Sequence, residues 1–336
     1  MELGLSSFGD TATPTGAGAR LRELVAEAEL ADRLGLDVFG VGEHHRADYA
    51  VSAPAVVLGA MAARTERIRL STAVTVLSSE DPVRVFQDFA TLDGLSSGRA
   101  EIMAGRGSFV ESFPLFGQDL DDYDELFATK LQLLLALARG GERVSWPGSK
   151  DRPPIPNLGV YPRPEQAQIL VWLAVGGSPQ SAVRAAQLDL PMMLAIIGGA
   201  PERFVPFAAL YRKSGGATLG INAFTYVAET SKQATAEFFG GYRDQMTKIG
   251  RERGWPPLSR EQYEAGLAPS GHLFVGDPDT VADKIIALHG LFAPARFLAQ
   301  TSVGTMPHEQ ILRSIELFAT EVAPRVREAL RTPVPA

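Results

Sequence analysis

Two of the five histidines in this chain, His44 and His45, follow an apolar run at residues 36–42 and are preceded by Glu43. Imidazole is the side chain best suited to moving protons near neutral pH. Enzymes built from strands and helices commonly place such groups where a buried strand opens into a loop. The tripeptide is also compatible with a histidine that only caps the strand end. Its interpretation therefore depends on the residues found at the ends of the other strands.

A second chemical signal is the turn Gly176-Gly177-Ser178-Pro179-Gln180-Ser181, which joins an apolar run to a helical pattern. The first N–H groups of a helix have no partner inside it, and glycines let a ligand approach them closely. The Ser178 and Ser181 hydroxyls could add hydrogen bonds, so the turn predicts a phosphate site. The alternative is that Ser178 only caps the helix, and the two interpretations are compatible.

The third signal is Arg106, which stands between Gly105 and Gly107. A guanidinium is permanently charged and can bind an anion through two parallel hydrogen bonds. An ion pair with a nearby carboxylate is the alternative. An arginine after one strand and a Gly-Gly-Ser helix start after the next could hold the same phosphate.

Other kinds of site find less support. The chain has no cysteine, which excludes disulfides, thiolate catalysis and cysteine-ligated metals. The histidines show no spacing typical of metal ligands, so no metal is expected. Ser178 lacks the G-x-S-x-G surroundings of a nucleophilic serine.

Short apolar runs alternate with helical patterns along the chain, which predicts strand–helix units around a parallel sheet. The predicted strands lie near residues 3–7, 38–42, 69–77, 100–104, 170–175, 192–197, 221–227 and 296–301. The predicted helices lie near residues 19–34, 54–64, 82–95, 123–139, 179–188, 201–213, 231–250, 278–291 and 307–330. Eight units favour an α/β fold of the (β/α)₈ TIM-barrel type, in which the predicted site residues gather at the carboxyl ends of the strands. An open doubly wound sheet is the alternative, but no G-x-G-x-x-G follows the first strand.

We expect a single barrel domain over residues 1–331, with insertions at about residues 107–165 and 250–272 and a frayed tail at 332–336. The insertions are rich in proline, and long loops of this kind are often functional. They are expected near the barrel mouth, or else as irregular packing around the helices. The net charge of −7 and the lack of a basic run argue against nucleic acid or a membrane surface as a partner. A cytoplasmic protein is expected.

Several fragments, in order, resemble the luciferase-like flavin monooxygenases of the bacterial luciferase superfamily. They are LDVFGVGEHH at residues 36–45, RLSTAV at 69–74, DPVR at 81–84, LDGLSSGR at 92–99, GRG at 105–107, VGGSPQS at 175–181 and VGTMPHE at 303–309. Each fragment is short, but their order and spacing along the whole chain are specific. The resemblance implies a (β/α)₈ barrel, reduced FMN as cosubstrate and a homodimer.

The resemblance also assigns residues. It implies that His44 is catalytic, with Glu43 and His45 supporting it. It implies a non-proline cis peptide at Ala73-Val74 beneath the flavin ring, and a phosphate site made by Arg106 with Gly176, Gly177, Ser178 and Ser181. The chain departs from luciferase in the turn, where glycine replaces an acidic residue, and at Gly105, where luciferase has a reactive cysteine. Light emission is therefore not expected.

The expected function is that of a two-component monooxygenase, which uses O₂ and FMN reduced by a separate flavin reductase to oxygenate a small organic substrate. One alternative is an oxidoreductase of the same fold that transfers hydride from a deazaflavin. Another is a flavin-binding protein without catalysis. The substrate itself is not indicated by the sequence.

Overall fold

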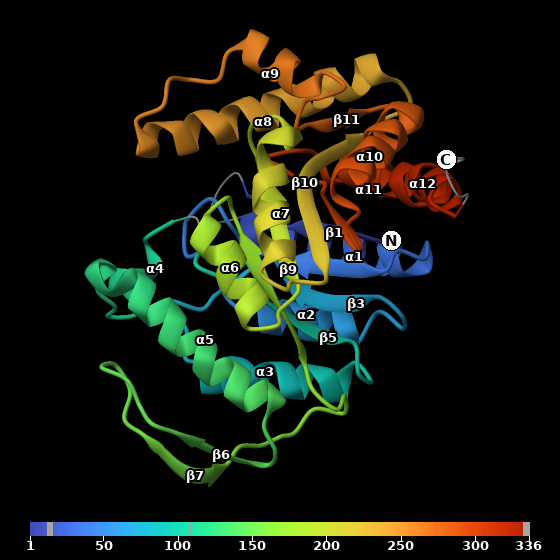
Figure 1. Cartoon of the computed structure of the whole chain (residues 1–336). Coiled ribbons are helices and arrows are strands. Elements are labelled where there is room, and N and C mark those ends of the chain that lie inside the picture. Colours follow the sequence, from blue (N-terminus) through green and yellow to red (C-terminus); the bar gives the residue numbers. More distant parts are fainter. Residues whose placement is uncertain (12–15, 108, 332–336) are drawn as a thin grey trace.

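The computed structural model describes residues 1–11, 16–107 and 109–331. Eight parallel strands form a closed barrel, and helices surround it (Figure 1). The barrel strands are β1 (Glu2–Ser7), β2 (Val38–Val41), β3 (Arg69–Thr72), β5 (Ala100–Gly105), β8 (Leu170–Val175), β9 (Met192–Ile196), β10 (Leu219–Val227) and β12 (Arg296–Gln300). They pair in that order, and β12 returns to β1, which closes the ring. The predicted TIM barrel is confirmed.

The helices of the ring begin where the sequence indicated, and proline occupies the first turn of several of them. They are α1 (Ala17–Arg33), α2 (Pro54–Ala62), α3 (Pro82–Leu95), α5 (Tyr123–Arg139), α6 (Pro179–Gln187), α7 (Val205–Lys213), α8 (Ser231–Arg253), α10 (Pro278–Phe292), α11 (His308–Leu317) and α12 (Ala323–Ala329). A short 3₁₀ turn, η3 (Pro201–Phe204), precedes α7. A π-helical turn, η4 (Phe318–Val322), separates α11 from α12 where one helix was predicted.

Apart from β4, which lies within the strand expected at residues 69–77, the remaining elements were not predicted. The remaining elements are β4 (Thr75–Val76), α4 (Ser112–Leu115), η2 (Leu120–Asp122), β6 (Arg143–Trp146), β7 (Ile155–Gly159), α9 (Arg260–Leu267) and β11 (Phe274–Gly276). The strand expected at 69–77 is divided into β3 and β4 at Ala73-Val74. Among the described residues, every helix is too short or too polar to span a bilayer.

The two expected insertions lie in different places. In the first, residues 109–122 and the start of α5 are at the barrel mouth, since Phe109 and Tyr123 line cavities there. The β6–β7 hairpin instead lies outside the helix ring, beside α3 and α5 (Figure 1). Its side chains Val144, Trp146 and Ile155 join the main hydrophobic core. The second insertion continues α8 and contains α9. The tail at 332–336 lies outside the described residues.

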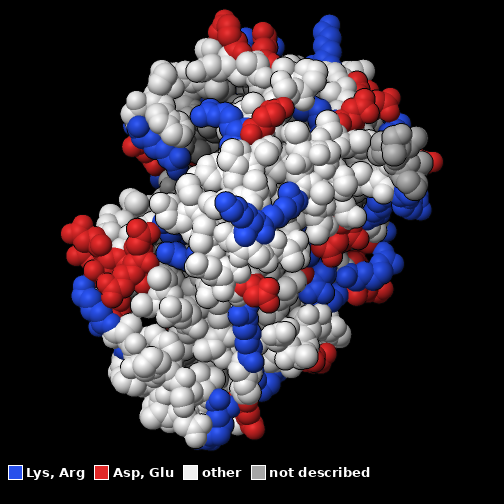
Figure 2. Space-filling model, in the orientation of Figure 1, with Lys and Arg blue, Asp and Glu red and all other residues white. Residues whose placement is uncertain are grey.

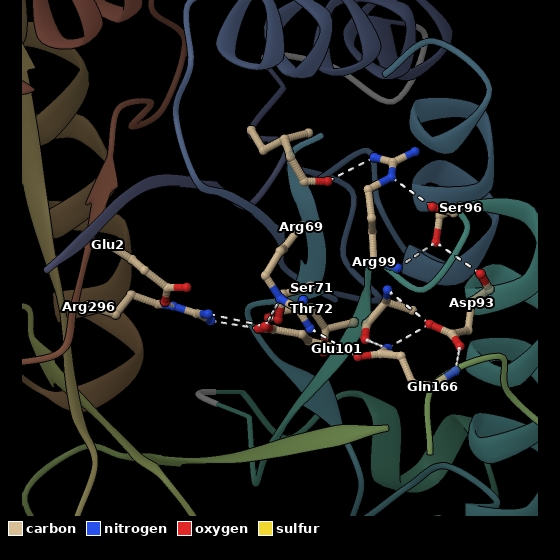
Figure 3. Close-up of polar contacts among 12 residues, drawn as sticks. Glu2, Arg69, Ser71, Thr72, Asp93, Ser96, Arg99, Glu101, Gln166 and Arg296 are labelled. Atoms are coloured by element: carbon tan, nitrogen blue, oxygen red, sulfur yellow. Dashed lines mark hydrogen bonds and ion pairs between the residues drawn. The ribbon is translucent and has the colours of Figure 1, made fainter. Parts of the chain in front are cut away.

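A buried ion network lies at the amino ends of the barrel strands, opposite the mouth. Figure 3 shows its side chains. Arg296 of β12 donates hydrogen bonds to Glu101 of β5, with Nη1–Oε2 at 2.6 Å, and to Glu2 of β1, with Nε–Oε2 at 2.7 Å. Arg69 of β3 also contacts Glu101. The guanidinium carbon of Arg296 lies 4.5 Å from the centre of the Trp172 ring. The network therefore joins strands that are not neighbours in the sheet.

Candidate active site

The loop after β2 holds His44 in a fixed position at the barrel mouth. The Gly42 N–H donates to Ser7 O and the His44 N–H donates to Val51 O, both at 2.9 Å. These bonds fasten the loop to β1 and to the segment that precedes α2. The His44 side chain is consequently held between the barrel and its covering segments, and the residue is only 8% exposed.

Aromatic rings surround His44. Its ring centre lies 4.1 Å from that of Tyr49 and 5.2 Å from those of Phe8 and Phe109. Burial, with the positive charge of Arg46 nearby, lowers the pKa of His44 to about 3. An imidazole in this environment is neutral at pH 7. It can accept a proton or share a hydrogen bond, but it does not carry the additional proton that a general acid would donate.

Glu43 and His45 pair with each other. His45 Nε2 and Glu43 Oε1 are 2.9 Å apart, and the other Glu43 oxygen accepts a hydrogen bond from the Val76 N–H, also at 2.9 Å. The hydrogen bond to Glu43 raises the pKa of His45. These bonds fix the loop to β4, so any support that the pair gives His44 acts through the backbone.

Glu80 lies beside this pair, and one ligand atom from each of Glu43, His45 and Glu80 falls within 4.8 Å of the others. The sequence spacing did not indicate this group because Glu80 comes from a later loop. Burial and the neighbouring Glu43 raise the pKa of Glu80, and the hydrogen bond to Glu43 raises that of His45.

The peptide bond between Ala73 and Val74 is cis, as the resemblance implied. Both residues line a cavity of about 250 Å³ at the barrel mouth. Two glycines make room for them. A Cβ on Gly105 would lie 2.6 Å from Val74 Cγ2, and one on Gly40 would lie 3.0 Å from Ala73 Cβ. Gly105 is thus required by packing in this chain.

Arg106 follows β5 and lines the same cavity. Its Nη2 donates to Ser181 Oγ at 3.4 Å, so the structure brings together the arginine and the strand-end turn that the sequence linked. Its Nη1 donates to Asp124 Oδ1 at 2.8 Å, and its guanidinium lies 5.2 Å from the centre of the Tyr123 ring. The ion-pair alternative is therefore also present. Asp124 belongs to an acidic group at the start of α5 (Figure 2).

The turn after β8 both caps a helix and contributes to the cavity, in line with the two interpretations of its sequence. Ser178 is the N-cap of α6, and its hydroxyl accepts a hydrogen bond from the Ser181 N–H at 3.4 Å. Gly177 has a φ of 109°, a conformation that glycine adopts without strain. Gly176 and Ser181 line the cavity, whereas Gly177 and Ser178 are not among its lining residues. Ser178 thus serves the helix, and Ser181 faces the cavity.

A second cavity, of about 290 Å³, adjoins the first. Five residues line both cavities, which are Phe8, His44, Gly176, Ala195 and Ile197. The second cavity is covered by the end of α8 and by Trp255. Ion pairs between Arg46 and Glu252 and between Lys248 and Asp48 hold α8 against the loop after β2. His44 therefore stands between two spaces large enough for small molecules.

Sequence reasoning missed most residues of the second cavity. Phe8, Tyr49, Phe109 and Gln245 come from separate segments and belong to no motif. A usable signal existed only for those that directly follow a predicted strand, such as Phe8 after β1.

The comparisons with known proteins agree with this geometry. The family model described as "Luciferase-like monooxygenase" matches residues 1–294. N-acetyl-S-alkylcysteine monooxygenase of Bacillus subtilis is 25% identical over 330 residues, which cover 93% of this chain and 94% of that protein. The crystal structure of the monooxygenase RslO1 from Streptomyces bottropensis has a TM-score of 0.83 and 26% identity, with 96% of this chain and 99% of that chain covered.

A further similar structure is the oxygenating constituent of 3,6-diketocamphane monooxygenase from Pseudomonas putida, in complex with FMN. Its TM-score is 0.79 at 18% identity, and the match covers 97% of this chain and 98% of that chain. At this identity the likeness supports the fold alone.

Proposed function

Because the chain belongs to the luciferase-like monooxygenase family, we propose that it is a monooxygenase that uses reduced FMN and O₂ to oxygenate a small organic substrate. Solved structures of this fold use flavins, either FMN or the deazaflavin F420. The flavin would occupy the first cavity, which Arg106 lines, and the substrate would occupy the second cavity, which Asp10 and Tyr49 line. A separate reductase would supply the reduced FMN, and we expect a homodimer.

The residues of the first cavity fit FMN. A phosphate needs compensating charge and hydrogen-bond donors, which the Arg106 guanidinium and the Ser181 hydroxyl can provide. A flat ring system needs a smooth apolar surface, which Ala73, Val74 and Met103 can provide. The observation that carries the proposal is that both kinds of surface line one cavity beside His44.

FMN, when bound and reduced, would supply the chemistry that activates O₂. The protein residues would perform the remaining tasks. Arg106 would exchange Asp124 for the phosphate, which is favourable because Asp124 is largely exposed. His44, being neutral, would accept or relay a proton at its unprotonated ring nitrogen. Phe8, Tyr49 and Phe109 would exclude water from the space around it.

Titration of FMN against the purified protein tests the flavin site. Arg106→Ala should weaken FMN binding by about 10- to 100-fold, since a charge-assisted contact is lost. Asp124→Asn is the matched control, because it removes the competing partner of Arg106 and should leave FMN affinity unchanged or higher. Equal FMN affinity in Arg106→Ala and the wild type, with the fold intact, would place the phosphate elsewhere.

Two further measurements separate the alternatives. A parallel titration with the deazaflavin would reveal tighter binding of that coenzyme if the chain is a hydride-transfer enzyme. Oxygen uptake with reduced FMN, in excess of the uptake of free reduced FMN, would contradict a flavin-binding protein without catalysis.

A further inference from the structure

A third of the residues that line the second cavity carry aromatic rings. Six aromatic side chains line it, contributed by the ends of β1 and β10, the mouth loops, η3 and the segment after α8, and these are Phe8, Tyr49, Phe109, Phe204, Phe224 and Trp255. Met246 and Ile249 of α8 add flexible and branched apolar surface. Rings of this kind pack favourably against the faces and edges of another flat ring.

One buried carboxyl group breaks this apolar lining. Asp10 is 5% exposed and lines the cavity. Its Oδ1 accepts a hydrogen bond from the Gly304 N–H at 3.2 Å, but its Oδ2 has no hydrogen-bond partner among the described residues. A bridge between Asp10 and Tyr49 fixes its backbone. A buried oxygen without a partner is costly, so a ligand that supplies a donor would gain affinity there.

The other ionisable groups of the lining do not offer a strong charge inside the cavity. His44 is neutral at pH 7, and Tyr49 is a phenol whose pKa burial raises. Arg253 is exposed at the edge, where its guanidinium lies 5.2 Å from the centre of the Trp255 ring. Burial raises the pKa of Asp10 to about 7. Protonated or not, its free oxygen can accept a hydrogen bond, whereas only the protonated form can donate one.

We propose that this cavity binds an uncharged aromatic substrate of about two fused rings, and that Asp10 selects it by accepting a hydrogen bond from a ring hydroxyl. The size follows from the volume of about 290 Å³, which lies near the lower limit for small-molecule sites. Calling this ligand a substrate rests on the proposed function. Binding to the cavity is a separate property that can be measured without turnover.

Calorimetric titration with a matched series of ligands tests the proposal. The probes are 2-naphthol, 2-methylnaphthalene, 2-naphthoate and 2-naphthylmethylammonium, which share a ring and differ in hydrogen bonding and charge. We expect 2-naphthol to bind about 10-fold more tightly than 2-methylnaphthalene, because one additional hydrogen bond is made. Both charged probes should bind more weakly than 2-naphthol. Equal binding of the two neutral probes, or tighter binding of a charged one, would overturn the proposal.

Variants locate the contact. Asp10→Leu should abolish the preference for 2-naphthol over 2-methylnaphthalene, whereas Asp10→Asn, which keeps an acceptor oxygen, should retain it. In case Asp10→Leu fails to fold, Ile249→Trp provides a second test, because the larger ring would fill the cavity. It should remove binding of both neutral probes, and Val56→Trp on the exposed face of α2 should not. Unchanged 2-naphthol binding in Ile249→Trp would show that the probe lies elsewhere.

An FMN titration on the same samples separates the two proposals. FMN binding without selective 2-naphthol binding would refute the substrate class alone. Selective 2-naphthol binding without FMN or deazaflavin binding would refute the proposed function and leave the cavity assignment standing.

Discussion

At the scale of single residues, the central question is what a neutral histidine between aromatic rings can do. His44 is held by its backbone, lines both cavities and has a pKa of about 3. His44→Ala should leave FMN affinity nearly intact, because Arg106 and Ser181 are unchanged. It should slow oxygenation by about 10²- to 10⁴-fold, the usual effect of losing a general acid–base group. Single-turnover kinetics with reduced FMN, O₂ and a bound substrate measure this.

His45→Ala is the matched control for that experiment. Its ring is hydrogen-bonded to Glu43 and lies 4.9 Å from Phe116, so we expect a smaller loss of rate. A wild-type rate in His44→Ala would remove the catalytic assignment. A larger loss in His45→Ala would transfer it to that residue.

The low pKa of His44 also predicts how stability depends on pH. Between the ordinary value of 6.5 and about 3, the unfolded chain binds a proton at this residue and the folded chain does not. The contribution of His44 to the free energy of unfolding is therefore fully present above pH 6.5. It is lost as the pH falls, by up to about 1.4 kcal/mol per pH unit.

Urea unfolding of the wild type and His44→Gln at about pH 7.5 and about pH 5 measures this dependence. The free energy of unfolding should fall more steeply in the wild type. The shifts of His272 and Asp10 are present in both proteins and cancel in the difference. Equal slopes would mean that folding does not lower the pKa of His44.

At the scale of elements, the sequence indicates every barrel strand because buried parallel strands form short apolar runs between proline-started helices. It does not indicate β6 and β7. Only alternate residues of β6 are buried, and β7 contains Pro156 and exposed residues. β6 contacts α5, and the buried side chains of both strands join the main hydrophobic core, so tertiary packing rather than a local pattern stabilises them. The three residues of β11 are too few to give a pattern of their own.

The segments over the mouth should respond differently to FMN. Residues 109–122 lie between Gly107 and Tyr123, which line the flavin cavity, and they carry exposed apolar side chains at Val110, Leu115 and Phe116. Residues 254–259 adjoin the substrate cavity instead. Thermolysin should cut both in the free protein, and FMN should protect the first more than the second, because ligands order the segments that cover them. Mass spectrometry of the fragments identifies the cuts.

The β6–β7 hairpin is the internal control for proteolysis, since it lies outside the helix ring. Its cleavage should not change when FMN is added. If FMN protects neither segment, or protects the hairpin equally, residues 109–122 do not cover the flavin.

At the scale of the whole molecule, barrel closure explains which parts of the site could be predicted. Because all strand ends meet at one face, residues that follow strands, such as His44, Arg106 and Ser181, come together whatever their separation in the chain. Asp10 and Gln245 could not be predicted. They reach the mouth through the packing of a loop and a helix, which produces no recognisable motif or residue spacing in the sequence. The roles of the predicted residues remain predictions, whereas their convergence is observed.

The opposite end of the barrel should determine stability without affecting the site. Burial alone would raise the pKa of Glu101, but Arg296 and Arg69 outweigh it and hold the pKa below its ordinary value. Glu101→Gln would remove the buried carboxylate that pairs with Arg296 and leave that guanidinium with Glu2, which is partly exposed (Figure 3). We expect the free energy of unfolding to fall by about 3–5 kcal/mol, as is usual when one member of a buried pair is removed.

Glu29→Gln, which breaks an exposed pair with Arg64, is the matched control and should cost less than about 1 kcal/mol. FMN affinity should be the same in both variants, because Glu101 lines neither cavity. Urea unfolding and FMN titration of the same samples measure the two properties. A loss of stability no greater than that of Glu29→Gln would show that water or rearrangement satisfies Arg296. A loss of FMN affinity in the folded Glu101→Gln protein would show instead that the two ends of the barrel are coupled.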